Sequence, residues 1–272
     1  MLEAIILGLI QGLTEFLPVS SSGHLVLGQA LLGLKEPEIF FDVILHLGTL
    51  AAVIILMRRE LSDLILEFFR LPRHLKSRSA AAAAWRERPS FRLLWLVFFG
   101  SIPTGLLGLG FKSLFEAMFA STLAVGVGLC LTGVVLAVTG WAKTQGRGLT
   151  RFRILDALAI GLAQGLAITP GLSRSGMTIS SGLFLGLDRE LAARYSFLMS
   201  IPAILGAAAV HLTQVKFSFF NPVEMAAGFI ASMITGLLAL GILLFIVKRG
   251  RLHWFAPYCW LIGLTTIYLC LR

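Results

Sequence analysis

The sequence predicts an all-α polytopic membrane protein with an inverted-topology repeat, about six transmembrane helices and two re-entrant broken-helix hairpins. Three observations predict this class. Of the 272 residues 57% are hydrophobic and 14% are charged, against about 45–50% and about 25% in a soluble domain, and the mean hydropathy is +0.88. Apolar stretches recur at membrane-spanning length. Two further apolar segments are interrupted in the middle and match each other.

Six apolar stretches are predicted to be transmembrane spans, because each can cross a hydrocarbon core of about 30 Å. They are residues 40–57, 93–111, 121–140, 192–212, 223–247 and 255–271. The first residues show neither a basic region nor a small-residue cleavage site, so we expect the first segment to belong to the mature fold rather than to a signal peptide.

Basic residues set the predicted orientation. The net charge of +9 is concentrated in hydrophilic breaks at 58–92, 143–153 and 248–251. Topology explains these breaks better than a nucleic-acid partner, which we do not expect, because the arginines do not follow a face with interleaved aromatic residues. The positive-inside rule places all three breaks in the cytoplasm. The connections at 112–120 and 213–221 are then expected on the outer side.

The two interrupted segments, residues 4–34 and 157–187, indicate an internal repeat. Each is broken by Pro, Gly and Ser into halves of roughly 13 residues, which are too short to span a bilayer. The segments align without a gap at an offset of 153 residues. Shared positions include Gly8/Gly161, Gln11/Gln164, Gly12/Gly165, Ser20/Ser173, Ser22/Ser175 and Gly23/Gly176. The predicted repeats are residues 1–150 and 151–272.

The predicted topology sends one broken segment in from the outside and the other in from the cytoplasm, so the repeats are expected to be inverted copies. Broken helices at matching positions point to a binding site near the bilayer midplane. Non-helical backbone is tolerated at that depth only where protein buries it or water lines it. Half-helices that start near Ser20 and Ser173 would direct backbone N–H groups at a shared cavity, which favours an anion.

Candidate chemistry lies where the two copies differ. The first break holds Glu15 and His24 where the second holds apolar residues, and the second holds Arg174 where the first holds Ser21. Ionisable groups at membrane depth indicate function by default. Ser21 and His24 lie three residues apart on one expected helical turn, which allows a nucleophile activated by a base.

The same cavity is predicted to bind a phosphate-bearing group. The fork of Arg174 can bind phosphate oxygens in bidentate fashion. The carboxylate of Glu15 would repel phosphate, which suggests a divalent cation, Mg²⁺ or Ca²⁺, with Glu15 as its ligand, or an acid/base role. The candidate substrate-binding residues are Ser20, Ser22, Ser173, Ser175, Thr178 and Gln11.

Structural interpretations of these residues remain open. Each serine at a helix start favours a cap over a nucleophile, apart from Ser21. Glu15 and Arg174 can form a buried structural ion pair, and His24 can be a satisfied core histidine. Asp42 and His46, four residues apart on a span, could bind a metal, but their spacing favours a local hydrogen-bonded pair.

At both breaks the sequence resembles the bacterial undecaprenyl-diphosphate phosphatases of the bacitracin-resistance family. That family has Glu/Gln-x-x-x-Glu followed by Pro-Val-Ser-Ser-x-Gly-His, and Pro-Gly-x-Ser-Arg-Ser-x-x-Thr. Residues 11–15, 18–24 and 170–178 match these motifs, and the resemblance covers nearly the whole chain. Gln11 takes the first acidic slot, so a site with paired carboxylates is not expected, and diphosphate oxygens and water would complete the cation's shell.

The resemblance implies hydrolysis of undecaprenyl diphosphate to undecaprenyl phosphate, the lipid carrier of cell-wall synthesis, aided by a divalent cation. It implies the bacterial inner membrane, with the site open to the periplasm or cell exterior. It also implies four working residues, which are Glu15, Ser21, His24 and Arg174. Bilayer lipids are expected partners, and a homodimer is left open.

The resulting hypothesis has Arg174 and the two helix N-termini clamp the diphosphate while His24 activates Ser21 for attack on phosphorus. His24 as the nucleophile fits the residues almost as well. A secondary transporter or flippase for a phosphate-bearing lipid or anion is the main alternative, because it shares inverted repeats and broken helices. An arginine in the cavity disfavours a third reading, an intramembrane serine protease.

Overall fold

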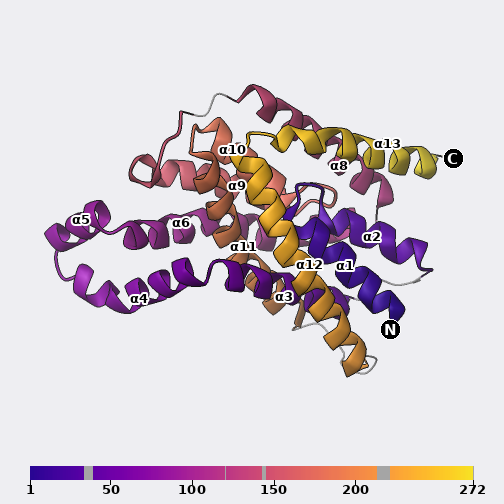
Figure 1. Ribbon diagram of the computed structural model, residues 1–272, viewed down its shortest axis with the longest axis horizontal. Coiled ribbons are helices and arrows are strands. Elements are labelled where there is room, and N and C mark those ends of the chain that lie inside the picture. The colour runs from indigo at the N-terminus through magenta and orange to yellow at the C-terminus, as the bar shows by residue number, and fades with distance from the viewer. Residues whose placement is uncertain (34–38, 120, 143–144, 213–220, 272) are drawn as a thin grey trace.

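The computed structural model describes residues 1–33, 39–119, 121–142, 145–212 and 221–271. In this part of the chain the regular structure is helical, and its one β-bridge is the isolated pair Arg147–Leu187 (Figure 1). Five helices are long and apolar enough to cross a membrane, and a sixth span results if one bent helix pair is counted. The predicted all-α polytopic membrane fold is therefore confirmed.

Both interrupted segments form a helix, a break and a second helix. The first consists of α1 (Leu2–Phe16) and α2 (Ser21–Leu31), and the second of α9 (Ile154–Leu166) and α10 (Arg174–Phe184). Pro18 ends α1, since the residue before a proline avoids the helical region, and Leu17 is extended at φ −60° and ψ 141°. At about 1.5 Å per residue none of these helices spans the bilayer alone.

Six longer helices coincide with the six predicted spans, and their ends differ from the predicted ends by at most four residues, as at Pro89 against 93. They are α3 (Ile39–Leu56), α6 (Pro89–Gly110), α8 (Thr122–Val138), α11 (Arg189–Leu212), α12 (Pro222–Lys248) and α13 (Ala256–Leu271). Apart from Asn221, the predicted outer connection at 213–221 lies outside the described residues.

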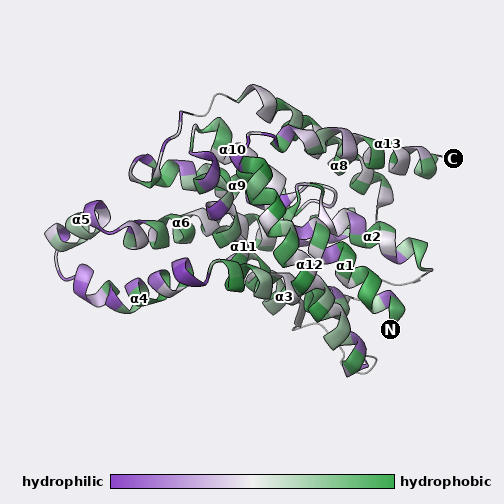
Figure 2. Cartoon of the chain, viewed as in Figure 1, coloured by the Kyte–Doolittle hydropathy of each residue, from purple (hydrophilic) through white to green (hydrophobic). Residues whose placement is uncertain are grey.

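The hydrophilic break at 58–92 is more ordered than the sequence interpretation implied. It forms α4 (Arg58–His74), bent by 85° from α3, and α5 (Arg78–Glu87), which project from one end of the molecule (Figure 1). Hydrophilic and hydrophobic residues alternate along α4, whereas α5 is a run of alanines between hydrophilic ends (Figure 2). The buried carboxylate of Glu67 accepts a hydrogen bond of 2.9 Å from Arg88, which lies between α5 and the next helix, and so ties α4 to the end of α5.

Helices of the first predicted repeat pack on helices of the second. The close pairs include α1 and α3 with α12, α9 with α6, and α8 with α13. A Cβ atom on Gly8 would lie 2.6 Å from the carbonyl oxygen of Gly228, and one on Gly161 would clash with Gly100. The aligned glycines thus permit close helix packing. The division at residue 150 and the inverted topology stay predictions.

Candidate active site

The carboxylate of Glu15 is the point at which the predicted site residues meet. Glu15 lies in the last turn of α1 and is 7% exposed. Ser21 Oγ donates a hydrogen bond of 2.6 Å to its Oε2, and Gln11 Nε2 donates one of 2.9 Å to the same oxygen. Arg174 Nη2 donates one of 2.8 Å to Oε1. The structure therefore brings Gln11, Glu15, Ser21 and Arg174 together from both broken segments.

A strained residue positions Ser21 against Glu15. Ser20 has φ +67°, the one positive φ of a residue other than glycine in the described chain, and such conformations concentrate at functional sites. Its Oγ accepts a hydrogen bond of 3.4 Å from the backbone N–H of Gly23 and lies 3.3 Å from Ser22 Oγ. Ser20 is thus the helix cap that one interpretation expected, and the next residue begins α2 facing α1.

The second break is anchored to α8. Gly171 has φ +84°, a left-handed conformation that suits glycine, and its carbonyl oxygen accepts a hydrogen bond of 3.0 Å from Thr132. Thr132 in turn accepts one of 3.0 Å from the backbone N–H of Ser173. The hydroxyl of Ser173 caps α10 through the N–H of Gly176 at 3.1 Å. Arg174 is therefore held at the first position of α10.

The remaining predicted binding residues of α10 are buried and join the two breaks. Ser175 Oγ donates a weak hydrogen bond of 3.4 Å to the carbonyl oxygen of Leu17. Thr178 Oγ1 donates one of 2.8 Å to the carbonyl oxygen of Arg174 and lies 2.6 Å from Ser196 Oγ. With 0% and 1% exposure, Ser175 and Thr178 stabilise the walls of the site, and their contact with a substrate stays a prediction.

His24 faces a different partner from the one expected. Its Nδ1 lies 2.8 Å from the carbonyl oxygen of Ser20, which can only accept, so Nδ1 carries the proton. Its Nε2 then accepts from the hydroxyl of Tyr258, 2.8 Å away, and the two rings stack with an interplanar angle of 8°. The hydrogen bonds of the described residues include none between Ser21 and His24, so activation of one by the other stays a prediction.

Three residues near the site were not predicted to belong to it, although His46 was named as one half of a local pair with Asp42. His46 Nε2 lies 3.7 Å from Glu15 Oε2, and its Nδ1 lies 2.7 Å from the backbone carbonyl oxygen of Asp42. The expected local pair therefore exists, but through the backbone. An ionisable group within a span was a usable signal for His46. Tyr258 and Ser196, whose carbonyl oxygen accepts from Arg174 at 3.4 Å, carried no such signal.

The divalent cation predicted at Glu15 stays a prediction, and the donor atoms near Glu15 limit how it could be held. Among the described residues there is no group of three or more His, Cys, Asp or Glu side chains that could hold a metal alone. Gln11 Oε1, however, is buried without a hydrogen-bond partner, one helical turn from Glu15. Mg²⁺ is commonly bound by one or two carboxylates together with substrate phosphates. The donor set thus suits a shared cation better than a closed protein site.

Comparisons with known proteins agree with the two motifs. The model of the family described as bacitracin resistance protein BacA matches residues 4–265. An undecaprenyl-diphosphatase of Desulfatibacillum aliphaticivorans is 48% identical over 268 residues, which cover 98% of this chain and 97% of that protein. An undecaprenyl-diphosphatase of Carboxydothermus hydrogenoformans is 42% identical, and the match covers 98% of this chain and 96% of that protein. One of Desulfosudis oleivorans is 44% identical, and the match covers 100% of this chain and 99% of that protein. The chain therefore belongs to the BacA family of bacitracin resistance proteins.

Proposed function

We propose that this chain is an undecaprenyl-diphosphatase, which hydrolyses undecaprenyl diphosphate to undecaprenyl phosphate and inorganic phosphate. Relatives bearing that name match it over nearly their full length. The observation that carries the proposal is the double contact of Glu15, which accepts from the Ser21 hydroxyl at 2.6 Å and from the Arg174 guanidinium at 2.8 Å. The carboxylate of Glu15, a candidate proton acceptor, thus contacts both a candidate nucleophile, Ser21, and a guanidinium that can bind phosphate, Arg174.

Substrate binding would rearrange this cluster. The diphosphate oxygens compete with Glu15 for the fork of Arg174, because charged oxygens of both kinds pair with guanidinium. When Arg174 turns to the terminal phosphate, Glu15 loses the guanidinium but keeps the hydrogen bonds of Ser21 and Gln11. The carboxylate is then free to accept a proton, so the substrate itself completes the site.

The first chemical step transfers the terminal phosphoryl group to Ser21. The hydroxyl proton of Ser21 passes to Glu15 Oε2 while Oγ forms a bond to the terminal phosphorus. The bond from that phosphorus to the bridging oxygen breaks, and undecaprenyl phosphate leaves with the bridging oxygen. Arg174 stabilises the charge on the equatorial oxygens, as basic side chains do in phosphoryl transfer.

The second step releases inorganic phosphate. The hydroxyl of Tyr258, which donates to His24 Nε2 at 2.8 Å, moves aside, and water attacks the phosphoserine and gives a proton to that nitrogen. Ser21 Oγ leaves phosphorus and recovers its proton from Glu15. His24 returns its proton to the departing phosphate, so the overall reaction consumes one water. This assignment gives the role of base toward Ser21 to Glu15, and that of base toward water to His24.

A divalent cation, Mg²⁺ or Ca²⁺, is part of the proposal. Glu15 Oε1, the oxygen that Arg174 leaves, and the unpaired Oε1 of Gln11 would hold it, while Glu15 Oε2 stays available for the proton of Ser21. When bound, the cation supplies charge neutralisation for the diphosphate and acts as a Lewis acid. The like charges of the substrate and Glu15 make such a partner necessary once Arg174 has moved to the phosphate.

Release of phosphate separates this function from transport. Purified full-length protein in detergent should release inorganic phosphate from undecaprenyl diphosphate, and the Ser21→Ala variant should not. A transporter or flippase that shares the fold would release none in detergent, where no compartments exist. Labelled phosphate on neither Ser21 nor His24 after rapid quenching would replace the covalent route with direct attack by water.

We further propose that the protein lies in the bacterial inner membrane with the site open to the periplasm or cell exterior, as the basic breaks indicate. The helices of membrane-spanning length support a multi-pass protein. Glu116→Cys on α7 (Lys112–Phe119) should react with an impermeant thiol reagent from outside, and Ala80→Cys on α5 only after lysis. Because Cys270 is exposed, both variants need a Cys270→Ser background. Labelling of residue 80 from outside, and of residue 116 only after lysis, would show that the topology is the reverse of the one proposed.

A further inference from the structure

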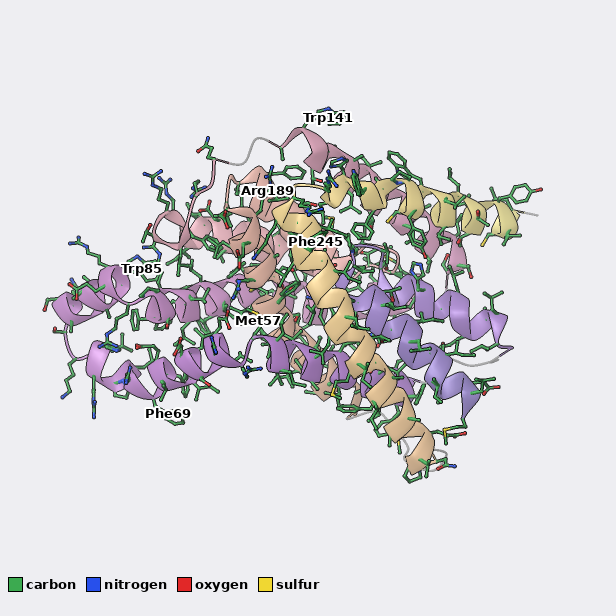
Figure 3. The ribbon with its side chains drawn as sticks, viewed as in Figure 1. Met57, Phe69, Trp85, Trp141, Arg189 and Phe245 are labelled. Atoms are coloured by element: carbon green, nitrogen blue, oxygen red, sulfur yellow. The ribbon has the colours of Figure 1, made fainter. Side chains whose placement is uncertain are left out.

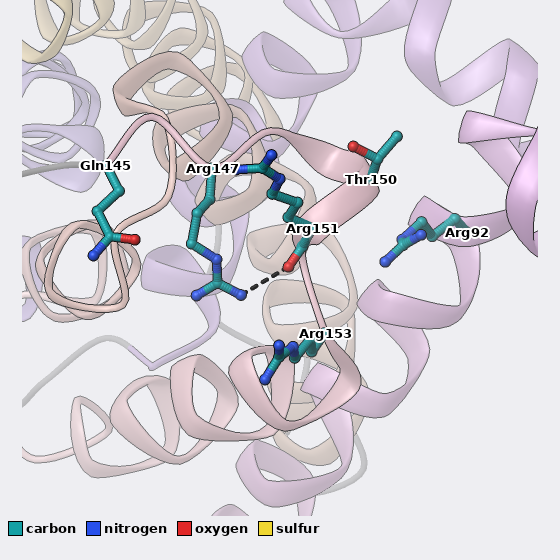
Figure 4. A pocket seen from close by; sticks show the side chains of 6 residues that line it. All are labelled: Arg92, Gln145, Arg147, Thr150, Arg151 and Arg153. Carbon is teal, nitrogen blue, oxygen red and sulfur yellow. Dashed lines mark hydrogen bonds between the residues drawn. The ribbon is translucent and has the colours of Figure 1, made fainter.

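A cavity lined by arginines lies away from the candidate active site. Its volume is about 390 Å³, within the usual range of small-ligand pockets. The lining residues, drawn in Figure 4, are Arg92, Gln145, Arg147, Thr150, Arg151 and Arg153. They come from two hydrophilic breaks that the sequence interpretation used only to set orientation. The structure shows that these breaks meet around one hollow.

The cavity and the active site are at opposite ends of α9. Arg153 directly precedes the first residue of this helix, and the break that leads to Arg174 follows its last residue. Thirteen helical residues extend about 20 Å at roughly 1.5 Å per residue. The arginines of the cavity therefore belong to a second site, which the proposed phosphatase chemistry does not use.

The charge in this cavity is only partly compensated. Arg147 Nη2 contacts Asp156 at 2.6 Å and also donates to the carbonyl oxygen of Arg151 at 2.7 Å (Figure 4). Among the described residues, Arg147 is the one arginine of the cavity that forms an ion pair. Arg92, Arg151 and Arg153 leave three guanidinium groups around the hollow without an acidic partner. Such a cluster favours binding of an anion.

Arg92 is held in a fixed orientation at the membrane boundary. It lies in the first turn of the spanning helix α6. Its Nη2 donates a hydrogen bond of 2.8 Å to the carbonyl oxygen of Phe152. Its guanidinium lies 4.8 Å from the ring centre of Trp85, a residue of α5 labelled in Figure 3. Its Nε is buried and has no partner. Tryptophan and arginine at the end of a spanning helix are typical of the lipid headgroup region.

We propose that this cavity binds the phosphate group of an anionic phospholipid such as phosphatidylglycerol. Basic pockets between spanning helices on the positive side bind anionic head groups, and guanidinium forks match phosphate oxygens. A phosphodiester seated between Arg92, Arg151 and Arg153 would compensate the three unpaired charges. The position of Arg92 at the start of a span favours a lipid over a soluble anion, because the lipid's acyl chains can remain in the bilayer.

The test compares two matched pairs of substitutions in the full-length protein. Arg151→Gln/Arg153→Gln removes two exposed arginines of the cavity. Arg249→Gln/Arg251→Gln removes two exposed arginines from another basic break, where they contact Phe245 and Trp254 instead. Both variants lose the same charge, so only the cavity distinguishes them. Short-chain phosphatidylglycerol, short-chain phosphatidylcholine and inorganic phosphate are the probes, and native mass spectrometry measures binding.

Phosphatidylglycerol should bind the Arg151→Gln/Arg153→Gln variant about 25-fold more weakly, since each arginine near an anionic headgroup contributes roughly a factor of five. The control pair should stay within about threefold of the parent protein. Unchanged phosphatase activity of both variants would show that they fold. The Ser21→Ala variant should bind phosphatidylglycerol like the parent, which separates the cavity from the active site.

Three results would overturn the assignment. Equal weakening in both arginine pairs would mean attraction to net charge without a site. Equally strong binding of phosphatidylcholine would mean that the anionic headgroup is not recognised. Inorganic phosphate binding as tightly as phosphatidylglycerol, with the same loss in the cavity variant, would make the cavity a site for soluble anions.

Discussion

Arg174→Lys tests whether the phosphate contact depends on the guanidinium fork or only on its charge. Arg174 places Nη2 on Glu15 at 2.8 Å and Nη1 3.4 Å from the carbonyl oxygen of Ser196. A lysine can keep the ion pair with Glu15 but offers one nitrogen in place of two. It therefore loses at least one charged hydrogen bond to the phosphoryl group in the transition state.

The expected loss follows from that single contact. A hydrogen bond to a charged group contributes about 1.5–3 kcal/mol, so kcat/KM should fall by a factor of about 10 to 150. Stability should change little, since the buried carboxylate keeps a cationic partner. Arg174→Ala leaves Glu15 buried without that partner and should destabilise the fold by roughly 3–5 kcal/mol. The two variants therefore differ in what they lose.

Phosphate release and thermal unfolding, measured on the same detergent preparations, give the two readouts. The Arg174→Lys variant should unfold within a few degrees of the parent, while its kcat/KM falls by a factor of about 10 to 150. Full activity in this variant would refute the bidentate clamp. A large loss of both stability and activity would instead assign Arg174 to a structural ion pair, the alternative that the sequence left open.

Three further substitutions test other parts of the site. Ser21→Ala should lower kcat by about 10⁴-fold or more, as loss of a nucleophile does, and a residual rate within tenfold of the parent would exclude Ser21 as nucleophile. Tyr258→Phe removes the hydroxyl that donates to His24 at 2.8 Å but keeps the ring stack, so kcat should fall about 2- to 10-fold with unchanged unfolding temperature. Gln11→Glu adds a second carboxylate beside Glu15 and should lower the Mg²⁺ concentration for half-maximal activity about tenfold. It should also make the unfolding temperature fall in a chelator, and no change in either quantity would contradict cation binding there.

Hydropathy and chain-breaking residues were sufficient to predict the main helices. Each span is a run of apolar residues, and the bilayer fixes the length at which such a run must be helical. Pro18 in the first segment, and Pro170 with Gly171 in the second, marked the two breaks because proline and glycine are both unfavourable inside a helix. Helix α4 was missed because its charged residues resemble a loop on a hydropathy scale, although Glu67 and Arg88 bind it to its neighbour at 2.9 Å.

The sequence alone also determined the main candidate site residues, since Glu15, His24 and Arg174 are ionisable groups within apolar segments. The tertiary structure decided how they pair. The left-handed backbone of Ser20 turns Ser21 toward Glu15, and Tyr258, 234 residues away in the chain, takes the free nitrogen of His24. Sequence spacing specifies which side chains share a helix face. Packing of the whole bundle decides the direction in which a helix starts. It also decides which side chains from distant parts of the chain lie opposite that helix.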